Sequence, residues 1–83
     1  MGLARRLERT REEVAEILND FLNGGGGPYD FDDFCSFPII DADLERIRLR
    51  CLVLHDEDPS PGAYCGQKGL DEIRGFLRDL RGS

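Results

Sequence analysis

The hydrophobic positions near the start of the chain repeat at intervals of three and four residues. The repeat runs through Leu3, Leu7, Thr10, Val14, Ile17 and Phe21, and Leu18 and Leu22 widen it. Arginine and glutamate fill most positions between, as on the solvent side of an amphipathic helix. The pattern predicts a helix over about residues 3–22. Four glycines at 24–27 predict its end and a flexible hinge.

Two further segments show the same helical period. The first begins at Asp41, a favoured N-cap residue, and predicts a helix over 41–54. Its apolar stripe is formed by Leu44, Ile47, Cys51 and Leu54. We place the arginines between them, Arg46, Arg48 and Arg50, on the exposed side or at the flank. The second predicts a helix over 67–81, with Leu70, Ile73, Leu77 and Leu80 at core spacing.

The residues between the first two helices have a less regular pattern. Aromatic residues at 29, 31, 34 and 37 fit neither a strand nor a long helix. Asp30 is positioned to cap a short helical turn near 30–35, and Pro38 favours extended backbone at Phe37. The prediction is one all-α domain over residues 1–83, a bundle of three main helices plus this short turn.

Composition and charge exclude several classes of function. The 83 residues include 11 Lys and Arg against 17 Asp and Glu, a formal net charge of −6. An acidic chain disfavours binding to nucleic acid or to an anionic membrane surface. No apolar run is long enough to span a membrane, and we see no secretory signal. Three cysteines cannot all pair within one chain, which favours reduced thiols in the cytoplasm.

The negative charge is concentrated in one quarter of the chain. Five carboxylates lie between Gly24 and Asp43, with no Lys or Arg among them, and aromatic residues alternate with them. Apolar contacts framed by charge are typical of a protein interface. We expect a protein partner, one with basic character, such as a basic toxin or a nucleic-acid enzyme. The candidate partner-binding residues are Tyr29, Asp30, Phe31, Asp32 and Asp33, with the rings as anchors if they are exposed. The alternative is that the rings belong to the core and the carboxylates cap turns.

Other chemistries have weaker support. Cys35, Cys51, His55 and Cys65 could supply four ligands to a structural or regulatory metal or thiol site. However, no Cys-x-x-Cys pair is present, Cys51 lies on the core stripe, and a lone histidine at a helix end is more often a cap. The glycine run follows a helix rather than a strand, unlike a phosphate-binding loop. We therefore expect no enzyme, no cofactor and no resident metal.

Self-association is a third possibility. A chain this short has a small core, and the glycine hinge at 24–27 would allow two copies to exchange a helix. The hydrophobic residues would then serve a homodimer.

Three motifs carry a resemblance. The first is Tyr29-Asp30-Phe31-Asp32-Asp33-Phe34. The second is Asp41-x-x-Leu44-x-x-Ile47-Arg48, and the third is Pro61-x-x-Tyr64-Cys65-x-x-x-Gly69-Leu70-x-x-Ile73-Arg74. Over about residues 18–80 the chain resembles a group of small uncharacterised bacterial proteins. The resemblance implies a bacterial source and a free-standing helical domain, and it assigns no catalytic or binding residue.

Overall fold

A computed structural model describes residues 8–24 and 31–82. Its four helices are α1 (Arg11–Leu22), α2 (Phe31–Ser36), α3 (Ala42–Glu57) and α4 (Gln67–Leu80). No strand forms in the described residues, which include an isolated β-bridge between Ser60 and Ala63. The all-α class, three main helices plus a short fourth, is therefore confirmed.

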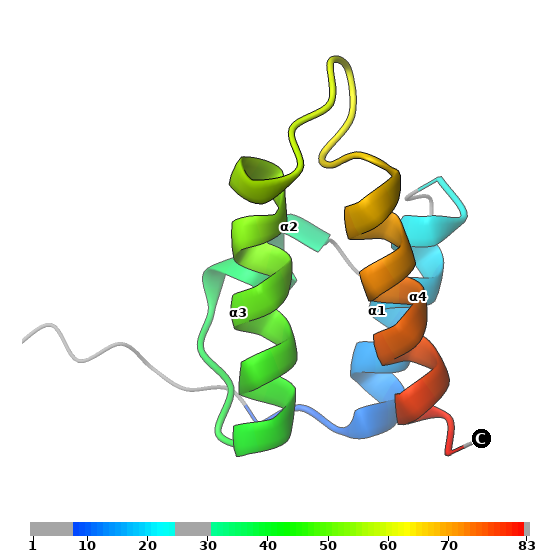
Figure 1. Ribbon diagram of the computed structural model, residues 1–83. Coiled ribbons are helices and arrows are strands. Elements are labelled where there is room, and N and C mark those ends of the chain that lie inside the picture. The colour runs from blue at the N-terminus through cyan, green and yellow to red at the C-terminus, as the bar shows by residue number, and fades with distance from the viewer. Residues whose placement is uncertain (1–7, 25–30, 83) are drawn as a thin grey trace, which may run out of the picture.

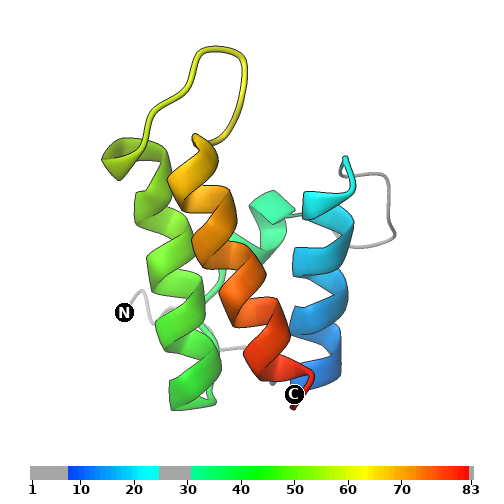
Figure 2. The same ribbon diagram turned by 45° about the vertical axis from the view of Figure 1, so that its right-hand side comes forward.

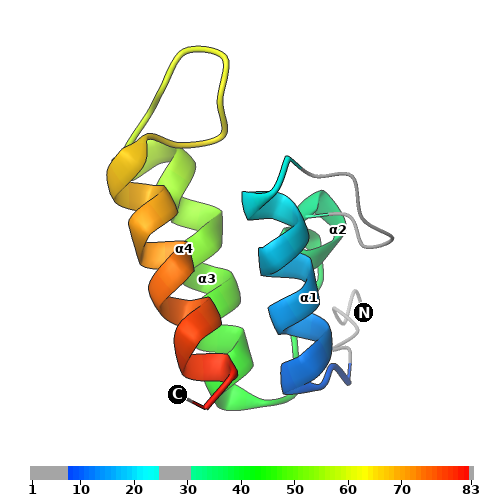
Figure 3. The ribbon, with the colours of Figure 1, turned by 90° about the vertical axis from the view of Figure 1, so that its right-hand side faces the viewer.

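α4 is the central long helix of the bundle, in contact with the other two long helices, α1 and α3. α4 contacts both α1 and α3, and the short α2 contacts the same two helices. α1 and α3 run in the same direction while α4 runs back between them (Figures 1 and 2). Figure 3 shows α4 lying in front of α3, with α2 behind the upper end of α1. The outer side of α3 is thus covered by no other described helix.

The first helix begins later than its hydrophobic pattern predicts. Residues 8–10 are not helical, and α1 starts at Arg11. Thr10 is not part of the apolar stripe but the N-cap: its Oγ1 accepts from the Glu13 N–H at 3.0 Å, and its own N–H donates to Glu13 Oε1 at 2.9 Å. This capping box satisfies two backbone donors at once and fixes the start of the helix. The expected helical residues 3–7 lie outside the described part of the chain.

The helix ends follow the expected chemistry elsewhere. Asn23 is the C-cap of α1, and Gly24 adopts a φ of 106°, which favours glycine; the remaining hinge residues, 25–27, are not described. Asp41 caps α3 as predicted, because its Oδ1 accepts from the Asp43 and Leu44 N–H groups at 2.9 and 3.0 Å. α3 runs three residues beyond the predicted end and stops before Asp58-Pro59.

The core forms where the helix stripes meet. The fully buried side chains come from all four helices and from the connections: Val14, Ile17, Leu18, Phe34, Ile39, Leu44, Cys51, Cys65 and Ile73. Beside them Phe21, Phe31, Phe34 and Tyr64 form an aromatic cluster. Phe21 and Phe31 are stacked with ring centroids 4.0 Å apart, and Tyr64 meets Phe31 edge-on at 5.1 Å. This cluster fixes α2 against α1.

The start of α4 is capped by a residue from the end of α3. Gly66, the N-cap, has no side chain to offer, and the Asp58 carboxylate takes its place by accepting from the Gly69 N–H at 2.9 Å. The Gly66 N–H also donates to the Asp58 carbonyl at 2.7 Å. A β-carbon on Gly66 would lie 2.8 Å from the Asp58 carboxylate oxygens. The cap therefore requires glycine at this position.

Two glycines of α4 should respond in opposite ways to alanine. A β-carbon on Gly69 would lie 2.6 Å from Cys65 Sγ, so we expect Gly69→Ala to cost about 1 to 3 kcal/mol of unfolding free energy through overpacking. Gly75 has only the Arg78 guanidinium near that position, at 3.9 Å, so Gly75→Ala should add about 0.5 to 1 kcal/mol from helix propensity. Urea unfolding followed by circular dichroism measures both. Equal effects of the two substitutions would contradict the packing at Cys65.

Candidate functional site

The predicted partner-binding residues separate into three groups. Tyr29 and Asp30, including the expected cap at Asp30, lie outside the described residues. Phe31 is half-buried in the aromatic cluster rather than fully exposed, and its role as an anchor for a partner stays a prediction. It faces inward because stacking on Phe21 removes its apolar ring from water. Asp32 and Asp33 lie exposed in the first turn of α2, where a partner could contact them, and they remain candidate binding residues.

The connection from α2 to α3 exposes hydrophobic side chains. Phe37 is 45% exposed and Ile40 is 61% exposed, although their neighbour Ile39 is fully buried. The chain leaves α2 at Ser36, whose hydroxyl donates to the Asp32 carbonyl at 2.7 Å, and then passes through Pro38 to Ile39, which has a β-bridge conformation. In extended backbone successive side chains point to opposite sides, so burying Ile39 exposes Ile40. A large apolar side chain left in water is a candidate contact residue.

An ion pair between the buried Arg48 and the half-buried Glu45 holds this connection in place. Arg48 donates to both carboxylate oxygens of Glu45, at 2.8 and 2.7 Å, and to the Cys35 carbonyl at 2.7 Å. Glu45 in turn accepts from the Ile39 N–H at 2.8 Å. The network therefore joins the end of α2, the connection and the first turns of α3. Its hydrogen bonds raise the pKa of Arg48, against the opposing effect of burial.

Arg48 corrects the sequence prediction for the arginines of α3. We expected it to lie exposed or at the flank, but it is 6% exposed. A charge can be buried here because a carboxylate neutralises it and a backbone carbonyl accepts from its third nitrogen, Nη1. The three-residue spacing from Glu45 was visible in the sequence, but only the fold brings the Cys35 carbonyl within reach.

A shallow groove lies beside the exposed connection. It has a volume of about 380 Å³, and Ile39, Ile40, Ala42 and Leu49 are among its lining residues. Leu49 is 47% exposed and Leu52, three residues further along α3, is 46% exposed. Sequence analysis missed Leu49 and Leu52 because only the stripe facing the core was counted. The signal was available, since helical spacing places both outside the core stripe of Leu44, Ile47, Cys51 and Leu54.

The metal-ligand alternative receives no support from the geometry. Cys35, Cys51 and Cys65 are buried free thiols, while His55 is exposed at the end of α3. Within the ranges 8–24 and 31–82, no three His, Cys, Asp or Glu side chains gather closely enough to hold a metal ion. These four residues therefore do not form a ligand set.

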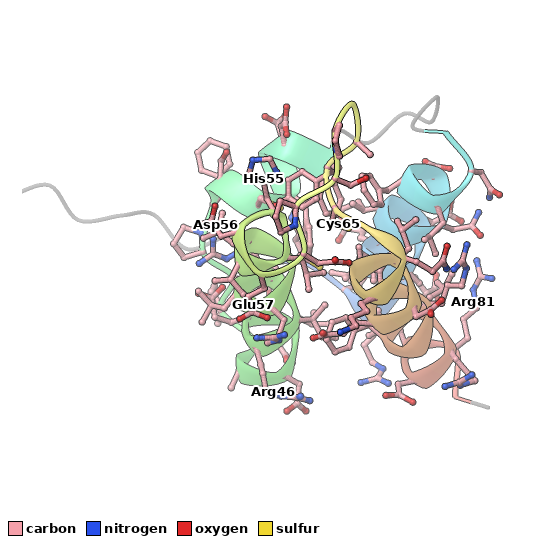
Figure 4. All side chains as sticks on the ribbon, turned by 45° about the horizontal axis from the view of Figure 1, so that its top comes forward. Arg46, His55, Asp56, Glu57, Cys65 and Arg81 are labelled. Atoms are coloured by element: carbon pink, nitrogen blue, oxygen red, sulfur yellow. The ribbon has the colours of Figure 1, made fainter. Side chains whose placement is uncertain are left out.

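His55 and Tyr64 instead fasten the loop after α3. His55 Nδ1 lies 2.8 Å from the Tyr64 carbonyl oxygen, and the Tyr64 hydroxyl donates to the Cys51 carbonyl at 2.8 Å. Figure 4 shows His55 at the end of α3, near this loop. The expected helix-end role of His55 is thus directed at the loop backbone rather than at the last carbonyls of its own helix.

The buried thiols are poor nucleophiles. Burial raises the pKa of Cys35 to about 11, although the Tyr64 hydroxyl opposes the shift. Burial also raises the pKa of Cys51 far above its usual range, with Cys35, Glu72 and Cys65 adding to it. Burial raises the pKa of Cys65 as well, assisted by the Asp58 carboxylate. Because the thiolate is the reactive form, burial disfavours covalent chemistry at these three cysteines at neutral pH.

None of the described helices combines the length and the apolar character needed to cross a lipid bilayer.

The chain was also compared with known proteins. No family model, no curated protein and no solved structure matches the chain.

Proposed function

We propose that this chain is a protein-interaction module that binds its partner through the acidic segment, residues 29–43, of which the structure describes 31–43. The observation that carries the proposal is the exposure of Phe37 and Ile40 within this segment. Five carboxylates accompany them in the sequence of the segment, which contains no Lys or Arg. Exposed apolar side chains framed by charge match the anatomy of a protein interface.

The chemistry of the segment indicates the kind of partner. The exposed side chains of Phe37 and Ile40 would fit an apolar pocket on the partner, and the carboxylates around them favour Lys or Arg at the edge of that pocket. Complementary charge accelerates encounter and selects among partners more than it adds to affinity. An inhibitor or adaptor of a basic protein fits this description. The Arg48–Glu45 network supports the proposal, because a surface that is held in position loses less entropy on binding.

The cellular location forms part of the proposal. Three free, buried cysteines are common in a reducing compartment and unusual in a small secreted domain, which normally pairs its cysteines. We place the chain in the cytoplasm, where its partner would also lie.

The proposal is tested by capture with matched variants. The immobilised chain is exposed to lysate of its source cells at low salt, and retained proteins are quantified by mass spectrometry. We expect one basic protein to be retained and to fall at least tenfold with Phe37→Ser or Ile40→Ser, both at exposed positions that tolerate substitution. Glu16→Gln, an exposed carboxylate on α1, should retain it fully.

The charge contribution is measured on the partner once it is purified. Replacing Asp30, Asp32 and Asp33 together by asparagine should weaken binding and flatten its dependence on salt, because steering charges act over a screened distance. Unfolding by urea checks that each variant is folded. Binding that none of these variants reduces, or a folded chain that retains no protein, would overturn the proposal.

A further inference from the structure

α3 carries hydrophobic residues on two opposite faces. Its core face is formed by Leu44, Ile47, Cys51 and Leu54, all 5% exposed or less. The outer stripe, which we define as Arg46, Leu49, Leu52, Val53 and Asp56, lies on the other side at intervals of three and four residues. Leu49 and Leu52 are almost half exposed on it. A helix that needed only to pack against its own chain would be polar on this side.

The charges of the outer stripe lie at its two ends. Arg46 comes before the apolar residues and Asp56 comes after them, about 15 Å apart at the rise of an α-helix. Neither makes an ion pair within the described part of the chain. Figure 4 shows Arg46 near the start of α3 and Asp56 near its end, with Asp56 on the side of α3 away from α4.

The neighbouring charges of α3 are already paired. Arg50 donates to Glu57 and to Glu72, at distances from 2.7 to 3.2 Å, and joins α3 to α4. Glu45 is paired with Arg48. The outer stripe is therefore an apolar strip with one basic and one acidic end, and both end charges remain available to a partner.

We propose that a second copy of this chain covers the outer stripe, with the two α3 helices packed antiparallel. A two-fold axis level with Cys51, midway between residues 46 and 56, places Arg46 of each copy opposite Asp56 of the other. The same register places Leu49 opposite Val53. One surface then supplies both sides of the interface, as a two-fold dimer requires. A parallel pair would instead bring Arg46 against Arg46 and Asp56 against Asp56.

The small size of the outer stripe limits the expected affinity of the dimer. Three apolar residues and two ion pairs place the interface at the low end of the size range for specific complexes. We expect a reversible dimer with a dissociation constant on the order of tens of micromolar. The stripe borders the groove at Ile40 but shares no residue with the acidic segment, so dimerisation and partner binding are separable.

Sedimentation equilibrium from about 5 µM to about 1 mM tests the dimer over the concentration range that this affinity requires. We expect the wild type to dimerise reversibly, and Arg46→Glu or Asp56→Arg to weaken dimerisation at least tenfold by placing like charges opposite each other. An equimolar mixture of the two variants should dimerise again, because each introduced charge then faces its opposite. Lys68→Glu, the same change of charge at an exposed site on α4, should leave the dimer unaffected.

Each outcome of this experiment either supports or contradicts the proposed dimer. A monomeric wild type at the highest concentration, a dimer indifferent to both charge variants, or a mixture that stays monomeric would overturn it. Circular dichroism of each variant checks the fold. Asp56→Arg should still capture the partner of the acidic segment, so that failure of the dimer leaves the proposed function standing. Conversely, Phe37→Ser should abolish capture and leave the dimer intact.

Discussion

Replacing Arg48 with methionine is expected to lower the free energy of unfolding by about 3 kcal/mol or more. The substitution removes the Arg48 guanidinium from the Glu45 carboxylate, whose side chain is 17% exposed, and removes the donor to the Cys35 carbonyl. Removing one partner of a buried pair costs far more than the pair contributes, because the remaining charge must stay unpaired or the structure must open. Urea unfolding at pH 7 measures the loss.

An exposed ion pair with the same three-residue spacing provides the control. Arg74 and Asp71 are also three residues apart, at 3.0 Å, but their side chains are 52% and 64% exposed. Arg74→Met should cost less than about 0.5 kcal/mol, since water replaces the lost partner. Combining Arg48→Met with Glu45→Gln should recover part of the loss, because the amide oxygen can still accept from the Ile39 N–H without a buried charge. Similar losses at Arg48 and Arg74 would contradict the burial of the network.

Raising the pH above about 9 is expected to destabilise the fold strongly. In the unfolded chain a thiol ionises near pH 8.5, whereas burial raises the pKa of Cys35 to about 11 and that of Cys51 further. Between these values the unfolded state binds fewer protons, so stability falls as the pH rises. Each such thiol should cost about 2 to 3 kcal/mol by pH 10.5. Below pH 8 both states keep the proton and the stability should not respond to these groups.

Unfolding curves between pH 7 and pH 10.5, recorded with a reductant, measure this slope. Cys51→Ala lowers stability at every pH by leaving a cavity, but it removes one titrating group and should make the alkaline slope shallower. Tyr64, whose pKa burial also raises, adds a loss of the same sign only above pH 10. A free energy of unfolding that stays constant to pH 10.5 would show that the thiols ionise equally in both states.

Local chemistry made most of the fold predictable. The Asp41 cap, the stripe of α3 and the start of α4 at Gln67 depend on neighbours a few residues apart, and all agree with the structure. The beginning of α1 was wrong because Thr10 fits the apolar spacing by chance. Its Thr-x-x-Glu signature with Glu13 was present in the sequence and identifies the capping box.

The candidate surface was harder to predict because it depends on contacts between distant segments. Asp32 and Asp33 could be proposed from charge alone, but the inward position of Phe31 results from stacking on Phe21, ten residues earlier. Burial of Arg48 depends on the Cys35 carbonyl thirteen residues away. The exposure of Ile40 depends on the burial of Ile39 by the assembled core. Periodicity within one helix contains none of this information.

The loop between α3 and α4 is closed at its base rather than at its tip. Asp58 and Tyr64 fasten the two sides, while Pro61, Gly62 and Ala63 stay exposed in a tight turn with Gly62 at a φ of 76°. The entropy of closing a loop grows only slowly with its length, so residues added at this tip would disturb little of the fold. An epitope or fluorescent label inserted there would leave the acidic segment and the outer stripe uncovered. Partner binding and dimerisation could then both be followed with one labelled chain in living cells.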